Sequence, residues 1–199
     1  EHKEKSKAEK SLGNENMEIE VELNEFVGYE NTESKSKIYQ VETYDDKFII
    51  FTKENPFYFE AGGQISDKGV ITIDDTSIEV IDVFQASNGA TGLIVDSDIF
   101  KVDQEVELSV NKSFRSGVSK SHTGAHIVHS ALRNILGDHV AQAGSNVTPG
   151  KFRFDFSHTE KVSQEELDEI FALSNSAVFE DYEVNTNIMN IDEAKNEGA

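Results

Sequence analysis

The spacing of apolar residues changes near residue 114 and divides the chain into two unlike parts. Before this point, short alternating or apolar runs are separated by Asn, Asp, Gly and Ser, a pattern typical of strands joined by turns. After it, apolar residues recur at spacings of three and four, which predicts one broad apolar face of a helix over residues 114–136. The sequence therefore predicts an α+β fold in which an all-β half precedes a mixed half.

The first half is predicted to form an antiparallel, barrel-like sheet or a sandwich, with turns at residues 45–46, 74–75 and 88–89. Residues 1–16 are polar and have no apolar face to bury, so they are interpreted as a tail or linker. A β-barrel-like domain is then expected at residues 17–112. The expected strands are residues 17–23, 37–44, 48–52, 69–73, 77–84, 91–95 and 104–110.

Residues 113–199 are predicted to form an α+β core. Gly137 is a natural stop for the long helix. Ser163 and Glu166 have the spacing of a capping box, which opens a second helix to about residue 179. Further elements are expected as strands at residues 140–144, 151–156 and 182–189, a turn at 148–150, and a last helix from residue 192.

Composition excludes several classes of protein. The 199 residues contain no apolar run near the roughly 18 residues that span a bilayer, and the charged N-terminal segment lacks the apolar stretch of a signal peptide. We therefore expect a soluble, cytoplasmic chain with no membrane partner. The absence of cysteine excludes a disulfide framework and any thiolate zinc site built from this chain alone.

Charge is distributed unevenly along the chain. The net charge of −20 argues against a nucleic-acid partner, because phosphates bind Lys and Arg. Residues 111–161 nevertheless contain seven basic against three acidic residues, together with five of the six histidines. Histidine commonly binds metals and transfers protons near neutral pH, so this segment is a candidate site. The alternative is an ordinary core segment of an acidic protein.

His122 and His126 stand four residues apart on the predicted long helix, so their side chains project from one face about one turn apart. Two imidazoles make half of a tetrahedral zinc site; the alternative is two solvated or hydrogen-bonded histidines. His129 is interpreted as a neighbour of the pair. A metallopeptidase is disfavoured because Thr123 stands where an HExxH motif has glutamate.

A second candidate site follows an aromatic run, where Gly62, Gly63 and Gln64 are consecutive. Paired glycines permit positive φ and a close approach of the backbone to another group. The glutamine offers an amide donor and an acceptor. The alternative is a tight turn between strands with an exposed glutamine.

Several ordered runs accompany these segments: FYFEAGGQISDKG at 57–69, HTGAH at 122–126, ALR at 131–133, LGDHV at 136–140, QAGS at 142–145 and RFDFSH at 153–158. Over residues 26–199 the chain resembles the editing domain of alanyl-tRNA synthetases. Free-standing alanyl-tRNA editing proteins resemble the same region, and the second domain of threonyl-tRNA synthetases shares the HxxxH part. The resemblance implies hydrolysis of tRNA(Ala) mischarged with serine or glycine, at the acceptor end of the tRNA.

The resemblance also implies cofactors and site residues. Two further zinc ligands are expected from a CxxxH motif after residue 199, while ATP and magnesium belong to an aminoacylation domain of the parent enzyme. A free-standing deacylase acting in trans and a non-catalytic tRNA-binding module are the open alternatives, and the oligomeric state is open. The implied residues are His122 and His126 as zinc ligands, Gly62, Gly63, Gln64 and Thr123 in substrate binding, and Gln64, Gln142 and Asp155 in catalysis.

Overall fold

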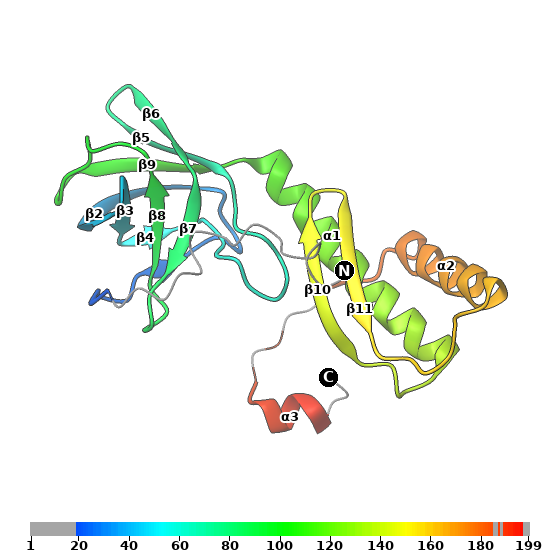
Figure 1. Ribbon diagram of the computed structural model, residues 1–199. Coiled ribbons are helices and arrows are strands. Elements are labelled where there is room, and N and C mark those ends of the chain that lie inside the picture. The colour runs from blue at the N-terminus through cyan, green and yellow to red at the C-terminus, as the bar shows by residue number, and fades with distance from the viewer. Residues whose placement is uncertain (1–18, 185–186, 188, 197–199) are drawn as a thin grey trace.

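The computed structural model describes residues 19–184, 187 and 189–196, and the predicted α+β fold class is confirmed. Figure 1 shows a curved sheet from the first half of the chain and a long helix that leaves it, carrying a strand hairpin and a second helix. The larger sheet has the strand order β6-β5-β9-β2-β3-β8-β7, and its neighbouring strands are antiparallel. Its strands are β2 (Glu33–Tyr44), β3 (Lys47–Thr52), β5 (Gly69–Ile73), β6 (Thr76–Val80), β7 (Asp82–Gln85), β8 (Thr91–Val95) and β9 (Glu105–Val110).

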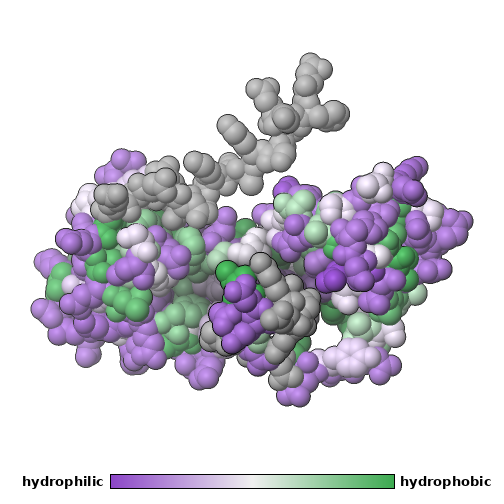
Figure 2. All heavy atoms as spheres, turned by 90° about the horizontal axis from the view of Figure 1, so that it is seen from below, coloured by the Kyte–Doolittle hydropathy of each residue, from purple (hydrophilic) through white to green (hydrophobic). Residues whose placement is uncertain are grey.

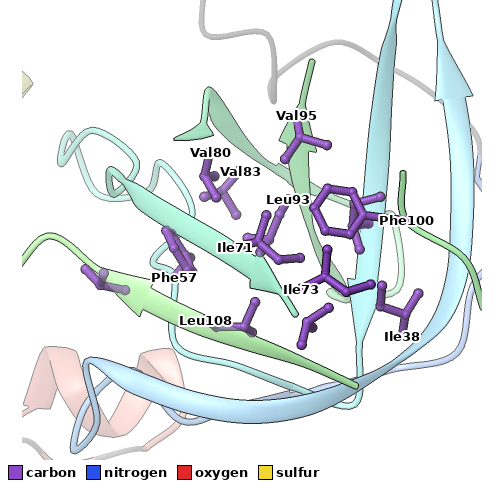
Figure 3. Packing of buried hydrophobic residues seen from close by; sticks show 13 residues of the cluster. Ile38, Phe57, Ile71, Ile73, Val80, Val83, Leu93, Val95, Phe100 and Leu108 are labelled. Carbon is purple, nitrogen blue, oxygen red and sulfur yellow. The ribbon is translucent and has the colours of Figure 1, made fainter. Parts of the chain in front are cut away.

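This sheet curls around an apolar core, as Figure 3 shows. Ile71, Leu93 and Leu108 meet there from three different strands and are almost completely buried. The edge strands β6 and β7 are consecutive in the chain, separated only by Ile81, whose N–H donates to the carbonyl of Ile94 at 2.8 Å. The curl therefore brings the two edges together, which makes the sheet barrel-like.

The predicted first strand is wrong for its described part, residues 19–23, which form no strand. Ile19 and Val21 do pack on a second buried cluster, formed by residues such as Phe51 and Phe84. The alternation of apolar residues thus predicted burial correctly. The backbone carbonyls of this segment, however, accept hydrogen bonds from side chains and not from the backbone of a neighbouring strand. The bonds are Gln40 Nε2 to Glu20 O (2.9 Å), Asn88 Nδ2 to Val21 O (2.6 Å) and Tyr39 Oη to Glu22 O (2.6 Å).

Other strand predictions need smaller corrections. The strand predicted at 77–84 is two strands, because the chain turns at Ile81 from one sheet edge to the other. The parallel pair of β1 (Glu25–Phe26) and β4 (Glu54–Asn55) was not predicted. The strand predicted at 182–189 is wrong for residues 182–184, 187 and 189, which are not in a strand. Residues 17–18, 185–186 and 188, and the predicted tail at 1–16, lie outside the described residues.

Helix α1 (Lys112–Leu136) begins directly after the last strand of the sheet. Asn111 caps it, because its Oδ1 accepts a hydrogen bond from Phe114 N at 3.0 Å. The predicted stop at Gly137 is confirmed: this glycine has a φ of 112°, and its N–H donates to Arg133 O at 3.0 Å.

The second part of the fold contains the hairpin of β10 (Gln142–Thr148) and β11 (Lys151–Phe156) and helix α2 (Gln164–Phe179), which pack on α1. Helix α3 (Ile191–Asn196) follows in the chain. The capping box of Ser163 and Glu166 is confirmed. Strand β10 starts two residues later than predicted, because Val140 N–H donates to Gly137 O in a turn. The core of this part contains Ala131, Leu132, Val140 and Ile170, with Phe154 and Phe156 against them.

No helix in the described ranges is long and apolar enough to cross a membrane. On the face shown in Figure 2, hydrophilic residues predominate over both parts of the molecule. This surface agrees with the net charge of −20.

A buried ion pair joins the two parts of the fold. Asp67, 1% exposed, follows the glycine-containing loop, and Arg115 lies in the first turn of α1. The guanidinium Nε lies 2.9 Å from both carboxylate oxygens, and Nη1 and Nη2 donate to the carbonyls of Gly28 (2.5 Å) and Pro56 (2.8 Å). Asp67 Oδ2 also accepts from Tyr58 N at 2.7 Å. The pair therefore fixes the start of α1 against the loop.

We expect Asp67→Asn to lower the free energy of unfolding by about 3 kcal/mol, because it leaves the Arg115 charge buried without its partner. Urea denaturation measures this change. The control is Asp46→Asn, which removes an exposed ion pair with Lys47 and should leave the denaturation midpoint unchanged. Equal midpoints for the two variants would show that the buried pair does not stabilise the fold.

Candidate functional site

The Gly62-Gly63 segment forms a two-residue turn. Ala61 and Gln64 exchange backbone hydrogen bonds of 3.2 and 3.0 Å across it. Both glycines have positive φ, 61° and 79°, as in a type I′ turn. Such a turn needs residues that tolerate the left-handed region, and the paired glycines supply them.

The turn packs against strand β10 of the second part of the fold. Val147 N–H donates to Gly63 O at 2.7 Å, and Ile65 N–H donates to Val147 O at 3.3 Å. A Cβ on Gly63 would stand 2.1 Å from Ser145 Oγ and 2.9 Å from Ser145 O. Only glycine fits this close approach. The loop between β4 and β5 thus extends from the sheet to the hairpin, as Figure 1 shows.

Gln64 connects the glycine turn to the histidine pair. Its side chain is 5% exposed, and its Oε1 lies 2.8 Å from Nδ1 of His122, although 58 positions separate the two residues. Because an amide oxygen only accepts, Nδ1 of His122 carries the hydrogen. The lone pair of the neutral ring is then on Nε2.

His122 and His126 lie together, as their four-residue spacing predicts. Their rings are stacked, with centroids 5.1 Å apart and an interplanar angle of 15°. His122 is half-buried and His126 is exposed. Burial, and in second place the charge of His126, lower the pKa of His122 below its ordinary value. The ring is thereby kept neutral, as a metal ligand must be.

The structure places the remaining predicted residues farther from this contact. Gln142 reaches the turn indirectly, since its Nε2 donates to Ser145 Oγ at 3.0 Å and Ser145 Oγ donates to Gly62 O at 3.5 Å. Asp155 is on β11 and accepts from Arg153 Nε at 3.1 Å. Neither has a described contact with the histidine pair.

Thr123 lies beside His126 on α1. It lines a groove of about 950 Å³ between α1, α2 and residues 182–184, together with His126, Ile127 and Ala177. His122 and Gln64 are not among the residues that line this groove. The structure therefore does not place Thr123 with the glutamine.

His129 was predicted as a neighbour of the pair. Its ring packs on Phe154, with centroids 4.9 Å apart, and its Nε2 is buried with no hydrogen-bond partner among the described residues. A group of three His, Cys, Asp or Glu side chains placed to hold a metal is absent from the described part of the chain.

Sequence reasoning did not assign roles to three residues that hold the site: Asp67 and Arg115, which join the loop to α1, and Ser145, which holds the turn. Asp67 and Ser145 stand within the runs that carry the resemblance, so those runs were the available signal. For Arg115 the sequence offers no local signal, because its partners are 48 to 87 positions away.

Comparison with known proteins shows the family to which the chain belongs. The family described as tRNA synthetases class II (A) matches residues 1–114, more than half of the chain. The chain therefore belongs to the class II (A) tRNA synthetase family.

Within that class the chain is similar to alanine–tRNA ligases. It is 40% identical to the enzyme of Oceanobacillus iheyensis in an alignment of 185 positions, which covers 87% of this chain and 21% of the relative. The enzyme of Lysinibacillus sphaericus is 40% identical, and the alignment covers 88% of this chain and 20% of the relative. The enzyme of Mesorhizobium japonicum is 37% identical, and the alignment covers 88% of this chain and 21% of the relative. The chain thus spans about a fifth of the length of the curated relatives it matches.

We expect Gly63→Ala to destabilise the protein by about 1 to 3 kcal/mol more than Gly150→Ala. Both glycines have positive φ, 79° and 71°, so both variants carry the same backbone strain. Only at Gly63 does the added Cβ collide with Ser145, whereas nothing lies within 4 Å of a Cβ at Gly150. Urea denaturation of both variants gives the difference, and equal losses would contradict the tight docking of the turn.

Proposed function

We propose that this segment is an editing site that hydrolyses the ester of tRNA(Ala) carrying serine or glycine. The observation that carries the proposal is the 2.8 Å contact between Gln64 Oε1 and His122 Nδ1, which joins the glycine turn to the paired histidines. The similarity to alanine–tRNA ligases supports it. A pocket for alanine discriminates weakly against a smaller amino acid or one that adds a hydroxyl, so such an enzyme needs a second, hydrolytic site.

The histidine pair fits a zinc ion as half of its ligand set. His122 donates through Nδ1 to an oxygen, the usual arrangement for a histidine that binds metal through its other nitrogen, and the ring of His126 stacks beside it. Since the described residues hold no third ligand nearby, the other ligands in this proposal come from outside them. A zinc ion bound here would polarise the ester carbonyl or lower the pKa of the attacking water.

The residues of the chain have separate tasks in this proposal. Gln64 fixes the ring and tautomer of His122 and offers its amide N–H group to the substrate. The exposed Gly62 backbone lets an amino-acid ester approach closely. Gln142, acting through Ser145, is a positioning residue for the turn. Thr123 lines the groove beside His126, and Asp155 pairs with Arg153, so this proposal gives neither residue a step in the reaction.

The reaction follows from these assignments. Water adds to the carbonyl carbon of the ester, and the bond to the ribose oxygen breaks. The products are the free amino acid, as a carboxylate with release of a proton, and a tRNA with a free terminal hydroxyl. We further propose that the whole enzyme, in the cytoplasm, uses ATP and magnesium to join alanine to tRNA(Ala).

Exposed basic residues support contact with a tRNA end. Lys151, Arg153 and Asp155 project from the same face of β11, alternating with aromatic residues of which Phe154 and Phe156 pack on the core. Arg153 pairs with Asp155 at 3.1 Å, which offsets its charge and leaves Lys151 as the unpaired cation of this face among the ion pairs of the described residues. Lys151 on this hairpin offers a partner for a phosphate despite the net charge of −20, and Arg153 can do so through the guanidinium nitrogens that Asp155 leaves free.

The test is a comparison of deacylation with aminoacylation in the enzyme that contains this segment. We expect His126→Gln to slow deacylation of seryl-tRNA(Ala) at least about 100-fold, because changes beside a metal ligand alone cost 10- to 100-fold. Aminoacylation with alanine should be unchanged. Ser116→Ala, at an exposed position near the start of α1, is the control and should leave both rates unchanged.

Two outcomes would overturn this proposal. Deacylation that survives His126→Gln would remove the histidine pair from the reaction. Binding of tRNA without any deacylation by the unaltered enzyme would instead identify a non-catalytic binding module.

A further inference from the structure

A second pair of histidines lies away from the candidate site, where α1 and β11 end. His139 follows the end of α1, and His158 follows β11 two residues after its last strand residue. Nε2 of His139 lies 2.8 Å from Nδ1 of His158. Nothing in the proposed editing reaction uses these two side chains.

The second pair has the geometry of the first. The His139 and His158 rings are stacked with centroids 5.1 Å apart and an interplanar angle of 22°. The corresponding values for His122 and His126 are 5.1 Å and 15°. Here, however, the two residues come from separate segments 19 positions apart, so the contact joins two elements instead of two turns of one helix.

The backbone holds both histidines in place. Ser157 N–H donates to Ala141 O at 3.0 Å, and Ser157 Oγ donates to His139 O at 3.3 Å. Val140, next to His139, is 2% exposed in the core of the second part. Gly137 leaves room for the ring, since a Cβ there would stand 3.1 Å from His139 Nδ1. The backbone beside both rings is therefore fixed, while the ring of His139 is exposed and open to an ion from solvent.

We propose that His139 and His158 form a second binding site for a divalent transition-metal ion that prefers imidazole, with zinc as the reference ion. Two imidazoles on a tetrahedral zinc with Zn–N bonds of 2.0–2.1 Å have nitrogens about 3.3 Å apart. The observed 2.8 Å requires the nitrogens to separate by only about 0.5 Å. The ion takes the place of the proton that the two rings share, and water completes its coordination.

An acidic residue stands near each histidine: Asp138 precedes His139 in the chain, and Glu166 interacts electrostatically with His158. The Asp138 side chain is almost fully exposed, and its Oδ1 lies 3.5 Å from Arg133 Nη2. Arg133 partly offsets the negative charge of Asp138. Glu166 caps α2, and its pKa is lowered first by the backbone hydrogen bond from Ser163 and last by the charge of His158. An ion bound by the pair would link the loop after α1 to the segment that leads into α2.

Calorimetric zinc titration of the 199-residue chain tests this site. The experiment uses a background in which His122→Gln and His126→Gln remove the first pair. We expect this protein to bind about one zinc per chain saturably, and expect His139→Gln or His158→Gln to weaken that binding at least tenfold. Both single variants are tested, so that a folding defect in one does not decide the result.

Asp138→Asn is the matched control, because it removes a neighbouring charge and leaves both rings in place. It should change the zinc affinity by less than the histidine variants do. No saturable binding in the background protein would overturn the second site. Binding that Asp138→Asn weakens as much as His139→Gln would also overturn it, by showing attraction of the ion to the acidic surface alone.

Discussion

The arrangement of the candidate site depends on the buried ion pair between Asp67 and Arg115. Asp67 belongs to the loop that carries the glycine turn, and Arg115 belongs to the helix that carries the histidines. Removing two charges from water is costly unless both are paired and hydrogen-bonded. Here the guanidinium also satisfies two carbonyls from other segments, Gly28 and Pro56. The contacts of the Arg115 side chain thus determine where α1 starts relative to the loop.

A second set of contacts holds the loop a few residues before Asp67. The Gly62-Gly63 turn docks on β10 through backbone hydrogen bonds, and the missing Cβ of Gly63 allows Ser145 to approach. Between these two attachments, Gln64 is held 2.8 Å from His122. The contact is therefore the result of attachments on both sides of the glutamine, one at the helix and one at the hairpin. A loop without these attachments would lose more conformational entropy on forming the contact between Gln64 and His122.

Local patterns in the sequence predicted much of the fold. Strands β5 and β8 were predicted to the residue, and the end of α1 at Gly137 and the capping box at Ser163 followed from local chemistry. The strand predicted at residues 17–23 is wrong over its described part, residues 19–23, because the apolar alternation there reflects burial, whereas distant side chains supply the hydrogen bonds. The spacing of His122 and His126 predicted their proximity. The contact of His122 with Gln64 joins residues 58 positions apart, so it was expected from the resemblance and not from local pattern.

The central claim is that Gln64 from the barrel-like part orients His122 of α1, and the tautomer of that ring tests it most directly. In metal-free protein, long-range proton–nitrogen NMR correlations show which ring nitrogen carries the hydrogen. The account predicts neutral His122 with its hydrogen on Nδ1, titrating below its ordinary pKa of 6.5, and a shift of that hydrogen towards Nε2 in Gln64→Ala. A neutral His122 with its hydrogen on Nε2 in the unaltered protein would contradict the account.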